Sequence, residues 1–203
     1  MGIQLGGSTP TTGGGISLVK GARIDLTKGN PGLDKILVGL GWDVNTNGGA
    51  DFDLDVEVFL LNANGKVVSP QHVVFYNNLN SPDGAVKHNG DNRTGIGDGD
   101  DETISIQLSQ VSPEVQKIIF AVTIYKANER KQNFGQVNNA YIRVMDETTG
   151  QQLCRFDLTE DYSTFISVKV GEVYRHNGEW KFGALGEGST NDLGGLLAEY
   201  GAM

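Results

Sequence analysis

Cysteine is nearly absent from this chain, which has Cys154 as its single example in 203 residues. One cysteine cannot form an intramolecular disulfide, and such sparing use of cysteine is typical of proteins in a reducing compartment. The sequence therefore predicts a fold that is stabilised by packing and hydrogen bonds alone.

Long apolar runs are missing as well. No stretch approaches the roughly 18 consecutive apolar residues that a membrane-spanning helix needs. Residues 1–15, MGIQLGGSTPTTGGG, have neither the basic region nor the apolar region of a signal peptide. We therefore expect a soluble, cytoplasmic protein that does not itself span the membrane. The glycine, serine and threonine content of residues 1–15 predicts a flexible arm.

Familiar catalytic motifs are also lacking. His72, His88 and His176 are scattered, and no carboxylate or serine lies at a spacing that suggests a catalytic triad. The chain has no nucleophile elbow, no P-loop and no Cys-x-x-Cys pair. These observations favour a binding protein over an enzyme of the familiar classes.

The chain is rich in glycine, with 29 residues, and in short runs of Val, Ile, Phe and Tyr that Gly, Asn, Asp and Pro interrupt. We predict strands at 16–19, 23–26, 35–42, 53–61, 72–76, 103–108, 117–125, 140–146, 152–157, 165–175 and 180–184. Asn177-Gly178 predicts a tight hairpin between the last two. Strands at such close spacing, joined by turns, predict an all-β fold, a two-sheet β-sandwich with short helical segments and long loops.

Two short helical segments are predicted. One begins with Ser112 as N-cap and Pro113 in the first helical position. The other lies at the end of the chain, where apolar residues recur at helical spacing: Leu193, Leu196, Leu197 and Tyr200. Gly194 and Gly195 weaken this helix, so we expect it to dock on a surface, first of all the chain's own sandwich and otherwise a partner protein. The predicted organisation is an arm at 1–15, a sandwich domain at 16–186, and a glycine-rich linker with a short amphipathic helix at 187–203.

Negative charge is confined to two segments. Segment 43–57 contains five acids and no base, whereas segment 91–102 contains five acids and one base, Arg93. Removing these segments leaves 15 acids and 15 bases, so the net charge of −9 comes entirely from them. A small basic stretch, with Lys126, Arg130 and Lys131, could attract an acidic partner, but a chain of this charge repels nucleic acid, which we do not expect as a partner.

Carboxylates at this density repel one another unless solvent, proton uptake or a cation offsets the repulsion. Glycines at positions 90, 95, 97 and 99 favour a cation, because they let the backbone bring several oxygens to one point. Oxygen ligands without Cys or His select Ca²⁺ or Mg²⁺, and six to eight ligands from flexible loops suit Ca²⁺ better. An EF-hand starting at Asp51 is excluded, because it requires glycine and glutamate where the chain has Val56 and Asn62.

In the segment 51–56, acids alternate with apolar residues, so a strand places the acids on the face opposite the core. Consecutive acids on that face lie about 7 Å apart and cannot all reach one ion, so we expect Asp53 and Asp55 to lie nearest the metal. The predicted site holds one or two Ca²⁺ ions, and its predicted ligands are Asp43, Asp53, Asp55, Asp91, Asn92, Asp98, Asp100, Asp101 and Glu102.

Eight sequence blocks, in this order, resemble the TerD family of tellurium-resistance and bacterial stress proteins over residues 16–186. They begin with Gly41-Trp42-Asp43, Asp53-Leu54-Asp55, the segment 75–84, and Gly90-Asp91-Asn92 with Gly95. They continue with the segment 99–102, the segment 133–137, Ala140-Tyr141-Ile142-Arg143, and Tyr174-Arg175 with the segment 178–182. The resemblance implies a Ca²⁺-binding β-sandwich from operons that confer resistance to tellurite, phage and other stresses. It implies no established catalytic activity.

Three functions remain open. The first is a non-catalytic Ca²⁺-binding stress-response protein, a calcium sensor or scaffold whose partners are calcium and other stress or tellurite-resistance proteins, with the inner face of the membrane as one meeting place. The second is a metal-dependent hydrolase that uses the same acidic loops. The third, direct chemistry on tellurite, is disfavoured because Cys154 lies inside a predicted strand, whereas reduction needs an accessible thiol of low pKa.

Overall fold

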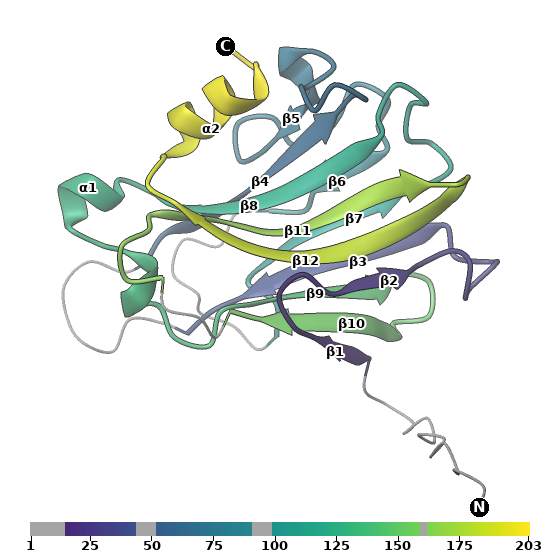
Figure 1. Ribbon diagram of the computed structural model, residues 1–203, viewed down its shortest axis with the longest axis horizontal. Coiled ribbons are helices and arrows are strands. Elements are labelled where there is room, and N and C mark those ends of the chain that lie inside the picture. The colour runs from purple at the N-terminus through teal and green to yellow at the C-terminus, as the bar shows by residue number, and fades with distance from the viewer. Residues whose placement is uncertain (1–14, 44–51, 91–98, 159–161) are drawn as a thin grey trace, which may run out of the picture.

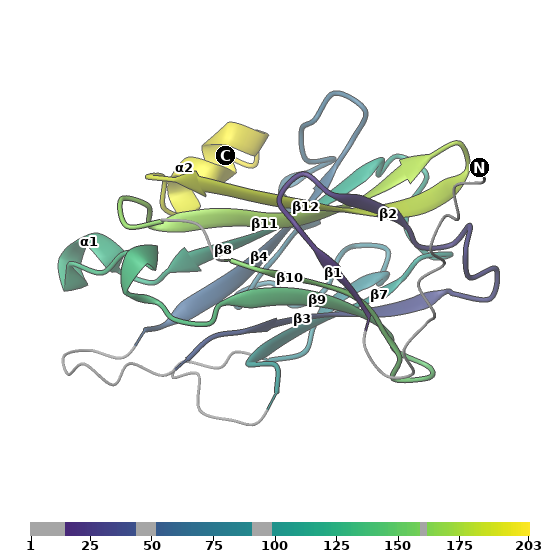
Figure 2. The same ribbon diagram turned by 60° about the horizontal axis from the view of Figure 1, so that its bottom comes forward.

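The computed structural model describes residues 15–43, 52–90, 99–158 and 162–203. Within these ranges the strands form two six-stranded sheets that pack face to face (Figures 1 and 2). The prediction of a two-sheet β-sandwich is therefore confirmed. The predicted arm falls outside the described residues except for Gly15.

The first sheet is assembled from strands that lie far apart in the sequence. Its order is β1 (Ile16–Leu18), β10 (Gln152–Asp157), β9 (Tyr141–Asp146), β3 (Lys35–Gly41), β7 (Glu102–Gln107) and β6 (Val86–His88). β1 pairs with β10 in parallel, and the other neighbours in this sheet are antiparallel. This order places β3 between β9 and β7, and residues from these three strands build part of the candidate site.

The second sheet is antiparallel throughout its described strands. Its order is β2 (Arg23–Asp25), β12 (Glu179–Ser189), β11 (Ser167–His176), β8 (Lys117–Ile124), β4 (Leu54–Leu61) and β5 (Val73–Val74). Asn177 and Gly178 connect β11 to β12 with φ values of 53° and 81°. Positive φ at both central residues is the requirement of a tight hairpin turn, so the predicted hairpin is confirmed.

Side chains of β4 alternate between two environments. Leu54, Val56, Val58 and Leu60 belong to the core between the sheets, whereas Phe59 and Leu61 belong to a second apolar cluster on the outer face of the second sheet. Asp55 and Glu57 share the outer face with Phe59 and Leu61 because successive strand residues point to opposite faces. One face of β4 thus carries acids at its start and apolar residues at its end.

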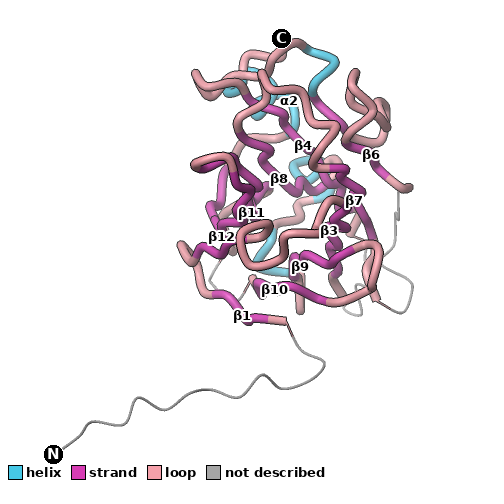
Figure 3. The backbone as a smooth tube through the Cα atoms, turned by 90° about the vertical axis from the view of Figure 1, so that its right-hand side faces the viewer, coloured by secondary structure: helices cyan, strands magenta, loops and turns pink. Residues whose placement is uncertain are grey.

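Helix α2 (Leu193–Tyr200) covers the apolar end of that face, as Figure 3 shows from the side. It begins at Asp192, whose carboxylate accepts a hydrogen bond from Gly195 N, and it ends at Gly201 with φ of 72°. Leu196 is fully buried in the outer cluster, and the rings of Tyr200 and Phe59 lie 4.7 Å apart. The terminal helix therefore docks on the chain's own sheet.

Several element boundaries differ from the prediction. The helical turn predicted at Ser112 was wrong: the chain makes a turn there, and Ser112 N donates to the carboxylate of Asp83 at 2.8 Å. Strand β6 was missed, as were the short helices η1 (Pro70–His72), α1 (Ala127–Arg130) and η2 (Phe134–Gln136). β12 runs to Ser189, beyond the predicted strand end at 184, because it stays paired with β11 as far as Ser167. Gly188 fits there under the ring of Phe165, where a Cβ would come within 2.3 Å.

Docking of α2 predicts a cost for trimming its contact face. Leu196→Ala removes a fully buried side chain, so we expect a loss of about 2–4 kcal/mol in the free energy of unfolding. Met203→Ala, at a position 82% exposed, is the control and should change it by less than about 0.5 kcal/mol. Urea denaturation measures both, and equal values for the two variants would contradict the docked position of the helix.

Candidate functional site

Six of the nine predicted ligands lie in the part of the chain that the structure describes. Asp43 follows β3, Asp100 and Asp101 directly precede β7, and Glu102 is the first residue of β7. Asp53 and Asp55 lie at the start of β4. Asp91, Asn92 and Asp98 fall outside the described residues, as do most of the two predicted loops.

Asp101 lies beside two other carboxylates at the end of β3. Its N–H donates to Leu40 O at 2.7 Å, and its Oδ2 accepts from Trp42 N at 2.8 Å. Burial raises the pKa of Asp101, the bond from Trp42 opposes the rise, and the carboxylates of Asp100 and Asp43 add to it. The fold therefore concentrates three acids here against their mutual repulsion.

Asp43 is the exposed member of this group. Its N–H donates to Asn138 O at 3.0 Å, and its Oδ2 accepts from Asn139 Nδ2 at 2.6 Å. Asn139 has φ of 54°, in the left-handed region that asparagine tolerates better than most residues. The Asn138-Asn139 turn before β9 thus holds the chain just beyond β3.

Asp100 is fixed by two residues of β9. Its Oδ1 accepts from Arg143 Nε at 2.8 Å and from Tyr141 Oη at 2.9 Å, and its Oδ2 accepts from Arg143 Nη2 at 3.0 Å. A Cβ at Gly39 would lie 2.0 Å from the Asp100 carboxylate, so glycine is required beneath it. Because both Asp100 oxygens have protein partners, its evident role is to anchor the chain that enters β7.

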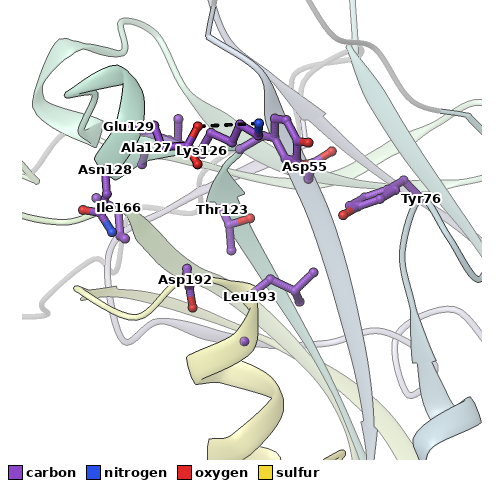
Figure 4. Close-up of a pocket in the computed structure, with 13 residues that line it drawn as sticks. Asp55, Tyr76, Thr123, Lys126, Ala127, Asn128, Glu129, Ile166, Asp192 and Leu193 are labelled. Carbon is purple, nitrogen blue, oxygen red and sulfur yellow. Dashed lines mark ion pairs between the residues drawn. The ribbon is translucent and has the colours of Figure 1, made fainter.

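The second group lies on the outer face of β4. Asp53 and Asp55 are each only 6% exposed, although alternation places them opposite the core. Arg130 Nη1 lies 3.5 Å from Asp53 Oδ2. Asp55 lines a pocket of about 340 Å³ that also contains Tyr76, Thr123 and the start of α2, as Figure 4 shows. The alternation predicted which way these acids point, but not that neighbouring elements cover them.

Glu57 is the acid that sequence reasoning left out of the site. It is fully buried, its Oε1 accepts from Thr123 Oγ1 at 2.7 Å, and its Oε2 has no hydrogen-bond partner among the described residues. Burial raises the pKa of Glu57 well above its usual value; the bond from Thr123 opposes this, and the carboxylates of Asp55 and Glu102 add to it. Glu57 follows Asp53 and Asp55 at steps of two residues, which places it on the same face of the strand. This spacing was the signal in the sequence that could have added Glu57 to the predicted site.

Glu102 connects the two groups and the two sheets. It belongs to β7 of the first sheet, yet its Oε2 accepts from Val56 N of β4, in the second sheet, at 2.9 Å. His88 Nε2 lies 3.5 Å from the same oxygen. Since Asp101 and Glu102 are consecutive, the chain passes directly from the first carboxylate group to the second.

Across residues 15–43, 52–90, 99–158 and 162–203, no three or more His, Cys, Asp or Glu side chains are arranged to hold a metal ion. The described carboxylates are brought into two neighbouring groups without forming a complete metal site among themselves.

A TerD domain model matches residues 15–200 of the chain. The chain belongs to the TerD family. It is 53% identical over 187 residues to general stress protein 16U of Bacillus subtilis (strain 168), covering 92% of this chain and 97% of the relative. It is 52% identical over 186 residues to tellurium resistance protein TerD of Serratia marcescens, with the same coverage. The family resemblance seen in the sequence is thus confirmed, and it extends through α2.

Solved structures support the TerD fold. A crystal structure of a homologue of telluride resistance protein (TerD), SCO6318 from Streptomyces coelicolor A3(2), superimposes with a TM-score of 0.68 at 24% identity, covering 85% of this chain and 99% of that one. A protein of unknown function, SAV2460, gives 0.69 at 25% identity, covering 84% and 98%. Among the described residues of this TerD-family chain, no helix is long and apolar enough to cross a membrane.

The Asp100–Arg143 pair yields a stability prediction for this TerD domain. Arg143→Gln leaves a carboxylate that is 6% exposed without its main partner, so unfolding should require about 2–3 kcal/mol less. Lys181→Gln, which breaks the more exposed pair with Asp25, should cost less than about 1 kcal/mol. Chemical denaturation gives the free energy of unfolding of both variants. A double-mutant cycle of Arg143→Gln with Asp100→Asn should give a coupling energy that stabilises the folded protein. Zero coupling would show that the pair does not anchor this segment.

Cys154 lies in the core, and burial raises the pKa of its thiol to about 12. A thiol with this pKa stays protonated near neutral pH and is a poor nucleophile. We therefore expect the native protein to react with a disulfide reagent such as DTNB only as fast as it unfolds, and the urea-denatured protein to react at once. Rapid labelling of the native protein would revive a redox role for Cys154.

Proposed function

We propose that this TerD-family protein is a cytoplasmic, non-catalytic Ca²⁺-binding protein of the tellurite-resistance type, acting as a calcium sensor or as a scaffold for partner proteins. The observation that carries the proposal is Glu57, a fully buried carboxyl group beside Asp55 and Glu102, one oxygen of which has no partner in the part of the chain that the structure describes. A buried carboxylate among others is costly unless it is protonated or a cation compensates it.

Charge around the two groups supports a cation. Arg143 compensates Asp100 closely, whereas the nearest approach of Arg130 to Asp53 is 3.5 Å. Asp43, Asp101, Asp55 and Glu57 add further acidity. Burial raises the pKa of Asp101 and of Glu57, and repulsion from neighbouring acids adds to both increases. Together these groups carry more negative charge than the nearby arginines offset.

The kind of oxygen donor fits calcium. The proposed ligands are carboxylates and one asparagine, a set that Ca²⁺ prefers and that suits zinc or copper poorly. Among the described residues, Asp43, Asp53, Asp55 and Asp101 would supply ligands, and Glu57 would join them through its Oε2. Asp91, Asn92 and Asp98 would complete one or two sites. Asp100 and Glu102, predicted as ligands, fit better as positioning residues, because Arg143 and Val56 already hold them.

A link to partners follows from where these acids lie. Glu102 joins β7 of one sheet to β4 of the other, so a cation bound beside it would change the contact between the sheets. An ion whose binding changes the contact between two parts of a fold, here the two sheets, can act as the signal of an ion sensor. Relatives named for tellurium resistance and general stress support a role among other stress or tellurite-resistance proteins. We propose the inner face of the membrane as one place where they assemble.

Calcium should stabilise the chelator-treated protein. A ligand at a hundred times its dissociation constant adds about 2.7 kcal/mol to stability. We expect a large upward shift of the melting temperature with Ca²⁺, a smaller one with Mg²⁺, and loss of both shifts in the Asp55→Asn, Asp101→Asn double variant. Glu114→Gln, an exposed acid away from both groups, is the control and should keep both shifts.

Calorimetry decides the same question independently. Titration of the chelator-treated wild-type protein with Ca²⁺ should release or absorb measurable heat, and the double variant should not. Absence of any heat at millimolar Ca²⁺ in a folded wild-type protein would rule out the proposed site. Turnover of phosphoester or ester substrates with Mg²⁺ or Mn²⁺ would instead favour a metal-dependent hydrolase.

A further inference from the structure

His88 is a histidine buried at the end of β6. Val86 of the same strand belongs to the core between the sheets, and His88, two residues further on, points to the same face. His88 is 1% exposed, and Glu102 beside it is 2% exposed. A polar ring in such a place is costly unless its nitrogens find partners.

Both ring nitrogens of His88 lie close to polar groups. Nδ1 accepts a hydrogen bond from Gly90 N at 3.2 Å. An imidazole nitrogen that accepts a hydrogen bond carries no proton, so the ring proton lies on Nε2. Nε2 lies 3.5 Å from Glu102 Oε2. The ring thus stands between a backbone N–H and a carboxylate, with an acceptor toward the first and a donor toward the second.

The two partners of His88 come from either side of the segment 91–98, which lies outside the described residues. Gly90 directly precedes this segment, and Glu102 follows it as the first residue of β7. Glu102 Oε2 also accepts from Val56 N of β4 at 2.9 Å. Three parts of the chain that carry proposed calcium ligands therefore meet at the His88 ring and the carboxylate beside it.

The outer side of the same strand end is fastened by other bonds. Asn89 N donates to Thr103 O at 3.0 Å, and Asn89 Nδ2 donates to Thr103 Oγ1 at 3.2 Å and to Ser105 Oγ at 2.8 Å. These bonds hold the end of β6 on β7, and they involve neither Gly90 nor the carboxylate of Glu102. The position of Gly90 relative to that carboxylate is left to His88.

Filling the core explains only part of this arrangement. A phenylalanine ring would occupy a similar volume, but it offers no acceptor to Gly90 N and no donor to Glu102. In metal sites, residues that hold the ligands without touching the ion are as much part of the site as the ligands, and replacing them weakens metal binding about 10–100-fold.

We propose that His88 is a positioning residue of the calcium site. It fixes Gly90 and Glu102 relative to each other, and through Glu102 it fixes Asp101 and the start of β4, so that carboxylates from separate parts of the chain stay close enough to share a cation. His88 does not bind the ion itself. The inference rests on the proposed calcium site, because the role of His88 is defined by its effect on Ca²⁺ affinity.

Substitutions of His88 that leave the charge of the ring unchanged test this role. His88→Phe keeps the ring and loses both polar contacts, so isothermal titration of the chelator-treated full chain should show Ca²⁺ binding about tenfold weaker than in the wild type. His88→Asn places an amide oxygen near the position of Nδ1, and His88→Gln places an amide nitrogen near that of Nε2. Each should recover part of the lost affinity, which a role in packing alone would not predict.

His72→Phe is the matched control. His72 is also buried, at 9% exposure, but it lies in η1 outside both carboxylate groups, and its Nδ1 is 2.8 Å from Ser69 Oγ. This variant should lose stability in urea denaturation with chelator and keep the Ca²⁺ affinity of the wild type. The same denaturation curves show that each His88 variant is folded.

Nitrogen-15 NMR of the histidine rings tests the contacts without any substitution. In the wild-type protein the signals of His88 should show a proton on Nε2 and none on Nδ1, both in chelator and with Ca²⁺. A proton on Nδ1 in the Ca²⁺-loaded protein would contradict the bond from Gly90 and overturn the proposal.

The titrations separate this proposal from the one on which it rests. Wild-type Ca²⁺ affinity in folded His88→Phe would overturn the role of His88 and leave the calcium site standing. Equal weakening in His72→Phe would reduce the effect to a general loss of stability. A wild-type protein that binds no Ca²⁺ would remove the site itself, and the role of His88 with it.

Discussion

Repulsion among carboxylates near the junction of β4 and β7 is the constraint around which this end of the sandwich is built. Asp55, Glu57 and Glu102 raise the free energy of one another's charged forms in a site from which water is largely excluded. At the same place, Glu102 spans the sheets through its bond to Val56 N. Charge balance and sheet-to-sheet contact therefore depend on the same few atoms, so a change in one changes the other.

Positioning and charge are divided among the acids. Asp100 is neutralised by Arg143 and seated over Gly39, so it fixes the backbone of Asp101. Glu102 does the same for the entry into β7 through its bond to β4. This division explains why ten acids occur where one or two cations need fewer: several of them hold the others in place, at the cost of added local charge.

The alternation of apolar and polar residues along the strands, with a period of two, and the tight turn at Asn177-Gly178 are local properties. The sandwich and its last hairpin could therefore be predicted from the sequence. The Asp100–Arg143 pair could not, because it depends on β9, β3 and β7 being neighbours, and strand order follows from long-range pairing. Burial of Asp53 and Asp55 was missed for a related reason: alternation indicates the face on which a residue lies, but not what covers that face.

Helix α2 gives the outer face of the second sheet its two unlike ends. Its first residues border the pocket of Asp55, and its last buried residue, Tyr200, borders a second groove lined by β8, β11 and β12. Between these ends Leu196 and Tyr200 pack on β4 and its neighbours, and β4 carries the acids on the same face. A ligand at either end would alter the seating of a helix that also borders the other. Because packed contacts transmit displacement along the helix, a cation bound beside Asp55 would change how Leu196 and Tyr200 pack on the sheet.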